Sequence, residues 1–165
     1  MGIKNELLKK EKIFVEKWFQ AVIETYPEQS AKAIGKESNQ FANPVGSVTR
    51  QTIENVFTLI TRDYNLKELE NTLDPIIRIR SVQAFSASEA VSFVFALKDI
   101  GEKLLDKKFT KEFNRIVDNI ALASFNRFVK CKEEIYLLKA NEGKRRVHKA
   151  FERAGLVDKL EETKF

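Results

Sequence analysis

Few residues in this chain could carry catalysis. The chain has one histidine, His148, and one cysteine, Cys131, which are too few ligands for a zinc site and are not arranged as a nucleophile with its base. Arg145 stands three residues before His148, where the Glu-x-x-His motif of a di-iron helical bundle requires a glutamate. The sequence therefore predicts no catalytic residue and no metal ligand.

Motifs for other kinds of catalysis are missing too. None of the 6 glycines falls at the spacing of a phosphate-binding loop. The paired carboxylates at 133–134 and 161–162 are adjacent in sequence, so they diverge on a helix and suit solvation better than acid–base work. We therefore expect a protein that is not an enzyme and has no cofactor.

Two arginines, Arg78 and Arg80, lie inside an apolar stretch at 73–86 that can be interpreted in two ways. Alternation over 77–80 suggests a strand with a charged face, whereas Asp74 and Pro75 suit the first turn of a helix. We favour a helix that starts there. Residues two apart on a helix point in different directions, so one arginine should be exposed and the other buried.

These arginines have a structural and a functional interpretation. In the first, each guanidinium caps carbonyl groups or pairs with nearby carboxylates, and we favour this. In the second, one of them binds an anion or a partner. A ligand site between helices would then combine Arg78 and Arg80 with Asn43 and Pro44, which belong to a predicted turn at 43–46.

Composition indicates the elements that position these residues. A chain of 165 residues that is 43% hydrophobic can bury one core, and 13 Phe against 6 Gly and 3 Pro favour long helices over short strands. Helical spacing of apolar residues predicts helices near 15–26, 28–35, 53–64, 76–82, 89–105 and 113–138. We expect Gly35 to end one helix in a left-handed conformation and Ser86 with Glu89 to form a capping box. The predicted class is all-α.

The last predicted helix has two apolar stripes. One runs from Phe113 to Leu138 and can face the core of the domain. The other contains Leu122, Phe125, Val129 and Tyr136 and needs a partner, most simply a second copy of the chain. We therefore predict a homodimer through this second stripe.

After position 140 the sequence becomes polar and basic, which predicts a domain at 1–140 and a basic helical extension at 141–165. Lys and Arg outnumber Glu over 127–153, so this helix could meet nucleic acid, an acidic membrane surface or an acidic protein. Acidic residues are interleaved and no aromatic stacking motif is present, which favours a solvated helical face over nucleic-acid binding. The candidate contacts for a protein partner are Lys144, Arg145, Arg146 and Lys149.

The start of the chain bears on its location. Residues 1–14 are charged from Lys4 onward and contain no apolar signal region. No apolar stretch approaches the roughly 20 residues of a membrane-spanning helix. A single Cys131 is consistent with a reducing compartment. We therefore expect a cytoplasmic protein without a membrane span.

Four segments together carry a family resemblance: 13–27, FANPVG at 41–46, LDPIIRIRSVQAFSASEAVSFVFALKDI at 73–100 and KEEIYLLKANEGKRR at 132–146. They resemble the N-terminal domain of the RsbRD type of RsbT co-antagonist. The resemblance implies an all-helical, globin-like, haem-free sensor domain of bacterial stress-response signalling. Such domains commonly precede a STAS domain or a histidine-kinase module and dimerise through their later helices. In this chain only residues 147–165 follow the resemblance, which fits both a free-standing member and an excised domain.

The resemblance and the residues together predict a globin-like helical bundle with a long C-terminal helix. Its expected function is a non-catalytic regulatory module that dimerises and relays a state change through that helix to a kinase or a STAS-type protein. The runner-up is a module that binds a small molecule or anion without a signalling output. A haem or redox globin is less favoured, because His148 lies outside the predicted core helices.

Overall fold

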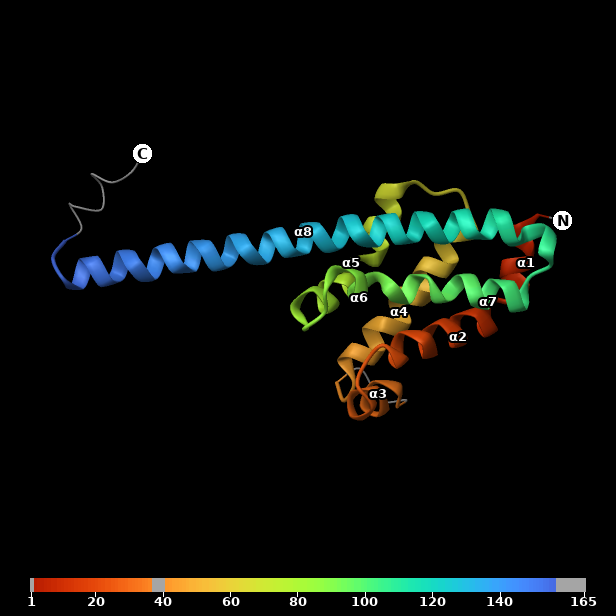
Figure 1. Cartoon of the computed structure of the whole chain (residues 1–165), viewed down its shortest axis with the longest axis horizontal. Helices are drawn as coiled ribbons and strands as arrows, with labels where there is room; N and C mark the ends of the chain where they lie inside the picture. The colour runs from red at the N-terminus through yellow and green to blue at the C-terminus, as the bar shows by residue number, and fades with distance from the viewer. Residues whose placement is uncertain (1, 37–40, 157–165) are drawn as a thin grey trace. The chain divides into compact units, whose positions relative to one another are not determined.

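The computed structural model describes residues 2–36 and 41–156. Within these ranges there is no β-strand, which confirms the all-α class and the long C-terminal helix (Figure 1). The helices are α1 (Ile3–Lys9), α2 (Glu11–Glu24), α3 (Glu28–Gly35), α4 (Pro44–Ile60), α5 (Leu66–Val82), α6 (Ala87–Val91), the 3₁₀ turn η1 (Ser92–Val94), α7 (Ala96–Leu104) and α8 (Lys107–Arg153).

The chain divides into two compact units. The first ends at Val129 and the second begins at Lys130, while α8 continues without a break through both. The boundary at 140 and the globin-like arrangement expected from the sequence stay predictions. No helix in the described ranges is long and apolar enough to cross a membrane.

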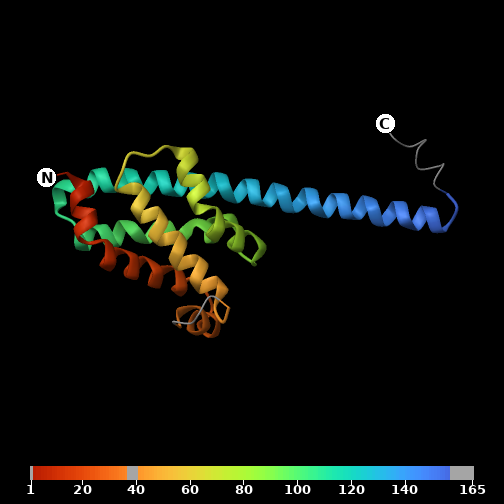
Figure 2. The same cartoon turned by 180° about the vertical axis from the view of Figure 1, so that it is seen from behind.

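Aromatic side chains build the core of the first unit. Phe14 of α2 lies with its ring centroid 5.4 Å from that of Phe57 and 5.5 Å from that of Phe113. These residues therefore join α2, α4 and α8. Helix α4 also packs along α5 and contacts α3, and Figure 2 shows it crossing this side of the unit.

The stretch after Ser86 forms a broken helix instead of the single one predicted. The capping box of Ser86 and Glu89 is present, as expected, but α6 ends at Val91 and η1 separates it from α7. The buried indole of Trp18 donates a hydrogen bond of 3.0 Å to the carbonyl of Phe93, which lies in η1. This bond holds the backbone of η1 against α2 and so stabilises the chain at the point where the helix is broken.

Helix α5 confirms the helical interpretation of residues 73–82, but its predicted start was wrong. It begins eight residues before Asp74, at Leu66, where Asn65 and Glu68 form a capping box. Pro75 therefore lies inside the helix, where it removes one backbone hydrogen bond. Pro75 is exposed, so water can satisfy the carbonyl that it leaves free.

The end of α3 also differs from the prediction. Gly35 does not adopt a left-handed conformation; Gly155 is the one residue of the described ranges with a positive φ. The Asn43 side chain instead donates hydrogen bonds to the carbonyls of Ile34 (2.7 Å) and Lys36 (3.1 Å). A side chain from the start of α4 thus satisfies groups that a glycine turn would otherwise satisfy.

Candidate functional site

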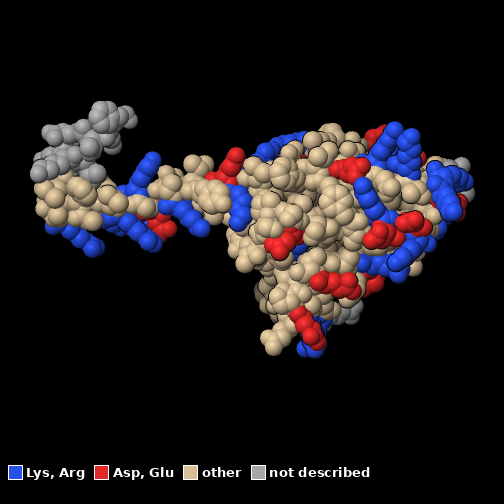
Figure 3. Space-filling view, viewed as in Figure 1, with Lys and Arg blue, Asp and Glu red and all other residues tan. Residues whose placement is uncertain are grey.

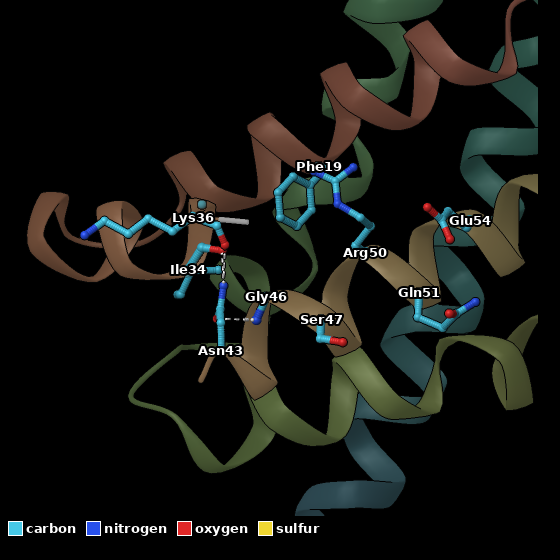
Figure 4. Close-up of a pocket in the computed structure, with 10 residues that line it drawn as sticks. Phe19, Ile34, Lys36, Asn43, Gly46, Ser47, Arg50, Gln51 and Glu54 are labelled. Atoms are coloured by element: carbon cyan, nitrogen blue, oxygen red, sulfur yellow. Dashed lines mark hydrogen bonds between the residues drawn. The ribbon is translucent and has the colours of Figure 1, made fainter. Parts of the chain in front are cut away.

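A polar hollow of about 410 Å³ lies where α3 ends and α4 begins (Figure 4). Asn43 forms part of its wall and is buried. Its side-chain amide nitrogen donates a hydrogen bond to the Ile34 carbonyl of α3, and its side-chain oxygen accepts a 2.9 Å hydrogen bond from the backbone N–H of Gly46. A Cβ atom on Gly46 would lie 2.3 Å from the Asn43 amide nitrogen, so only glycine fits here. The lining residues are Phe19, Ile34, Gly35, Lys36, Asn43, Gly46, Ser47, Arg50, Gln51 and Glu54.

Two cations line this hollow, and the sequence analysis did not single out either of them. Arg50 stacks over Phe19, with its guanidinium carbon 4.0 Å from the ring centroid, and pairs with Glu16 at 3.0 Å. Lys36 lines the same hollow from the end of α3. The spacing of Asn43 and Arg50, seven residues or two helical turns, was the available signal once α4 was known to begin at Pro44.

Arg80 is fully buried, with no exposed surface. Its guanidinium donates hydrogen bonds to the carbonyls of Ala90 (2.8 Å) and Glu89 (3.0 Å) and to the hydroxyl of Thr25 (3.1 Å). It also lies 4.2 Å from the ring centroid of Phe85. Burial lowers the pKa of this guanidinium from its ordinary value. Arg80 therefore joins α5 to α2 and α6, as the structural interpretation of the arginines predicted.

Arg78 is exposed on the same helix, which confirms that the two arginines differ in burial. It pairs with Asp74 at 3.2 Å, and Arg127 of α8 contacts the same carboxylate. Burial raises the pKa of Asp74, but the hydrogen bonds and charges of Arg78 and Arg127 outweigh this and hold it below its ordinary value. This carboxylate thus links α5 to α8.

The four residues of the predicted ligand site do not meet in the hollow. Asn43 lines it, whereas Pro44, Arg78 and Arg80 do not. The side chains of Asn43 and Arg80 donate hydrogen bonds to backbone carbonyls of neighbouring helices, and Arg78 pairs with Asp74. Their role in binding a ligand stays a prediction.

The predicted dimer surface is an exposed apolar stripe on α8. Leu122 is 60% exposed, Phe125 49% and Val129 37%. Phe95, which the sequence analysis did not assign to this surface, is 47% exposed and borders the same groove as Leu122 and Phe125. The groove has a volume of about 370 Å³ and is lined by Val91, Phe95, Asp118, Ala121, Leu122 and Phe125.

The other stripe of α8 is buried over part of its predicted length, whereas Leu138 at its end is 70% exposed. Of its residues in the first unit, Phe113, Val117, Ile120 and Phe128 are at most 5% exposed. Lys98 of α7 pairs with Asp118 of α8 at 2.8 Å beside the groove. One face of this part of α8 thus completes the core while the opposite face remains uncovered, which is the arrangement that the two stripes indicated.

The predicted partner contacts lie on α8 in the second unit, and all four are exposed. Lys144, Arg145 and Arg146 are consecutive, so they point about 100° apart around the helix and share no face. Arg146 pairs with Glu142 at 2.6 Å. Figure 3 shows Lys and Arg on more than one side of this part of α8, with acidic side chains among them. Contact with a partner stays a prediction.

The two side chains best suited to metal or redox chemistry are separated. Cys131 is buried, whereas His148 is exposed and lies 3.3 Å from Glu152. In the part of the chain that the structure describes, no group of three or more His, Cys, Asp or Glu is placed to hold a metal ion.

Comparison with known proteins gives one match. The profile of the family described as "RsbT co-antagonist protein rsbRD N-terminal domain" matches residues 13–142. Searches of curated proteins and of solved structures find no match. The matched segment covers most of the first unit and continues along α8 into the second. The chain therefore belongs to the RsbT co-antagonist protein rsbRD N-terminal domain family, whose members take part in stress-response signalling.

Proposed function

We propose that this chain is a non-catalytic sensory module that dimerises through the α8 stripe. The module passes a state change along α8 to a regulatory protein, either a kinase or a STAS-type protein. The family supports a regulatory role. The observation that carries the proposal is the exposed apolar stripe of Leu122, Phe125 and Val129 beside Phe95.

The chemistry of this stripe favours a protein partner over solvent. Large apolar side chains left in water cost free energy in proportion to their exposed area, and removing them from water is the main force in association. The stripe lies opposite the buried face of the same helix, so it is not an extension of the core of the first unit. A second copy would cover it with an identical stripe, as a two-fold dimer requires.

Replacing Leu122 and Phe125 together with glutamate tests the dimer. Each carboxylate would have to be buried without a partner in the dimer, so we expect a folded monomer. Light scattering measures the mass, and circular dichroism checks the fold. The matched control changes Leu66 and Val82, which are 43% and 70% exposed on α5, to glutamate. A Leu122/Phe125 variant that stays dimeric would remove this surface from the proposal.

The path of the signal is α8 itself. This helix contains the exposed stripe, the Arg127 contact with Asp74 and the basic residues at 144–149. We expect a change in how the stripe is covered to alter residues farther along the same helix. Substituting Lys144, Arg145, Arg146 and Lys149 with serine should leave the fold intact and weaken capture of the regulatory protein. Unchanged capture would count against the relay.

A second function is favoured by the hollow beside Asn43. Lys36 and Arg50 give it two cations, so it could hold a small carboxylate or phosphate compound. Thermal stabilisation by such anions, reduced in Arg50→Gln, is the expected result for ligand binding. Arg62→Gln, which changes another exposed arginine outside the hollow, is the control.

A further inference from the structure

The C-terminal part of α8 is a helix without cover. Every residue from Tyr136 to Ala150 is exposed. Isolated helices of this length are marginal in water, and Gly143 in the middle weakens the helix further. Within the helix, the ion pairs Arg146–Glu142 and His148–Glu152 are both exposed and therefore weak. The segment thus has the features of a helix that is completed by a partner.

One face of this segment has the spacing of a coiled-coil seam. Tyr136, Ala140, Gly143, Val147 and Ala150 follow one another at alternating intervals of four and three residues, which places them along one side of the helix. We refer to these five residues as the seam. A Cβ atom on Gly143 would meet no other atom, so the packing of the described chain does not require a glycine there. A partner helix approaching closely would use the room.

Basic residues line the edges of the seam. Lys139, Arg146 and Arg153 are spaced seven apart on one edge, and Lys144 lies on the other. The nearby carboxylates of Glu134, Glu142 and Glu152 fall at positions away from both edges. Leu137 and Phe151 share the edge of Lys144, and this pattern of Lys and Arg is selective for an acidic partner.

A second copy of this helix does not fit the seam. In a parallel pair, Lys139 would lie opposite Lys144 of the copy. In an antiparallel pair, the edge with Lys139, Arg146 and Arg153 would lie opposite the same edge of the copy. Like charges facing each other disfavour both arrangements. A membrane surface fits poorly too, because the alanines and glycine of the seam offer little apolar area for insertion.

We infer that the seam binds one helix of a regulatory protein that has large apolar residues on its own seam and Glu or Asp at both edges. This inference rests on the proposed function and names the chemistry of its partner. The large side chains would fill the room above Ala140 and Gly143, and the carboxylates would meet Lys139, Lys144 and Arg146. The seam continues the side of α8 that holds Leu122 and Val129, because Tyr136 and Gly143 follow Val129 at intervals of seven residues.

Two synthetic helical peptides, each about four heptads long with leucine seams, test the inference. One has glutamate at its edges and the other lysine, and binding to the whole chain is followed by fluorescence anisotropy. We expect binding of the glutamate peptide only. Lys139→Glu with Arg146→Glu should weaken binding of the glutamate peptide about tenfold, because two attractions between opposite charges are replaced by repulsions between carboxylates. The same variant should gain binding of the lysine peptide.

A matched variant separates edge charge from net charge. Lys107→Glu with Lys111→Glu changes the net charge equally but at exposed residues of the first unit, away from the seam, where salt screens the charge, so we expect less than about a twofold effect. Equal weakening by both variants, or no peptide binding, would overturn the inference. Binding to phosphatidylserine vesicles without peptide binding would overturn it in favour of a membrane. Light scattering on the same samples shows independently whether the proposed dimer is intact.

Discussion

Replacing Arg80 with methionine should cost the first unit about 3 kcal/mol of its free energy of unfolding. The change removes the guanidinium donors from the carbonyls of Ala90 and Glu89, the second of which keeps only the Ser92 hydroxyl, and two hydrogen bonds from a charged group contribute about 4 kcal/mol together. Loss of stacking on Phe85 adds about 1 kcal/mol. Removing a buried charge returns about 2 kcal/mol of desolvation, since a guanidinium is weakly hydrated.

Trp18 supplies the assay for this variant. It is the single tryptophan of the chain and is fully buried in the first unit, so its fluorescence in urea reports unfolding of that unit. A loss of this size lowers the melting temperature by about 6–12 °C. Arg78→Met is the control, because Arg78 is an exposed arginine two residues away, and it should cost about 0.5 kcal/mol. Equal losses in the two variants would refute the assignment of Arg80 as the residue that joins these helices.

Four further substitutions follow from the contacts described. Asp74 has a lowered pKa, so its stabilisation is present above the pKa of the unfolded state and is lost as pH falls through the folded value; Asp74→Asn should flatten the loss of stability measured below about pH 4. Gly46→Ala should destabilise the protein by about 1–3 kcal/mol, because the added methyl group would clash with Asn43. Gly143→Ala should stabilise the helix by up to about 1 kcal/mol. Melting temperatures that shift in the same direction for both variants would contradict this. Ser124→Ala should raise the free energy of unfolding by about 1 kcal/mol, because the buried hydroxyl makes no hydrogen bond within the described residues; a destabilised variant would show that the hydroxyl has a partner.

The sequence predicted what depends on periodicity and local capping. Helical spacing identified both stripes of α8, and the Ser86 capping box begins a helix where the motif placed it. Two arginines at positions 78 and 80 had to point apart on a helix, and they do. These features are set by residues a few positions apart, so local physical chemistry is enough to predict them.

The features that the sequence did not predict depend on contacts between distant residues. The break at η1 is stabilised by the bond between Trp18 and Phe93, which are 75 positions apart. The start of α5 was predicted wrongly because Asp74 and Pro75 are typical of a first helical turn. The helix instead begins at the capping box of Asn65, nine residues earlier in the sequence. Arg50 joins the hollow only through the meeting of α3 and α4. Tertiary packing decided the break and the hollow, whereas a local capping box sets the start of α5.

The continuity of α8 has a consequence for the order of its exposed part. Starting a helix is unfavourable, whereas lengthening an existing one costs little for each added residue. The packed turns of α8 in the first unit therefore act as a nucleus from which residues 130–153 propagate as helix. If a signal frays α8 near Val129, the nucleus is lost and the seam melts as one cooperative segment. Helix–coil cooperativity would then switch partner binding without moving any rigid body.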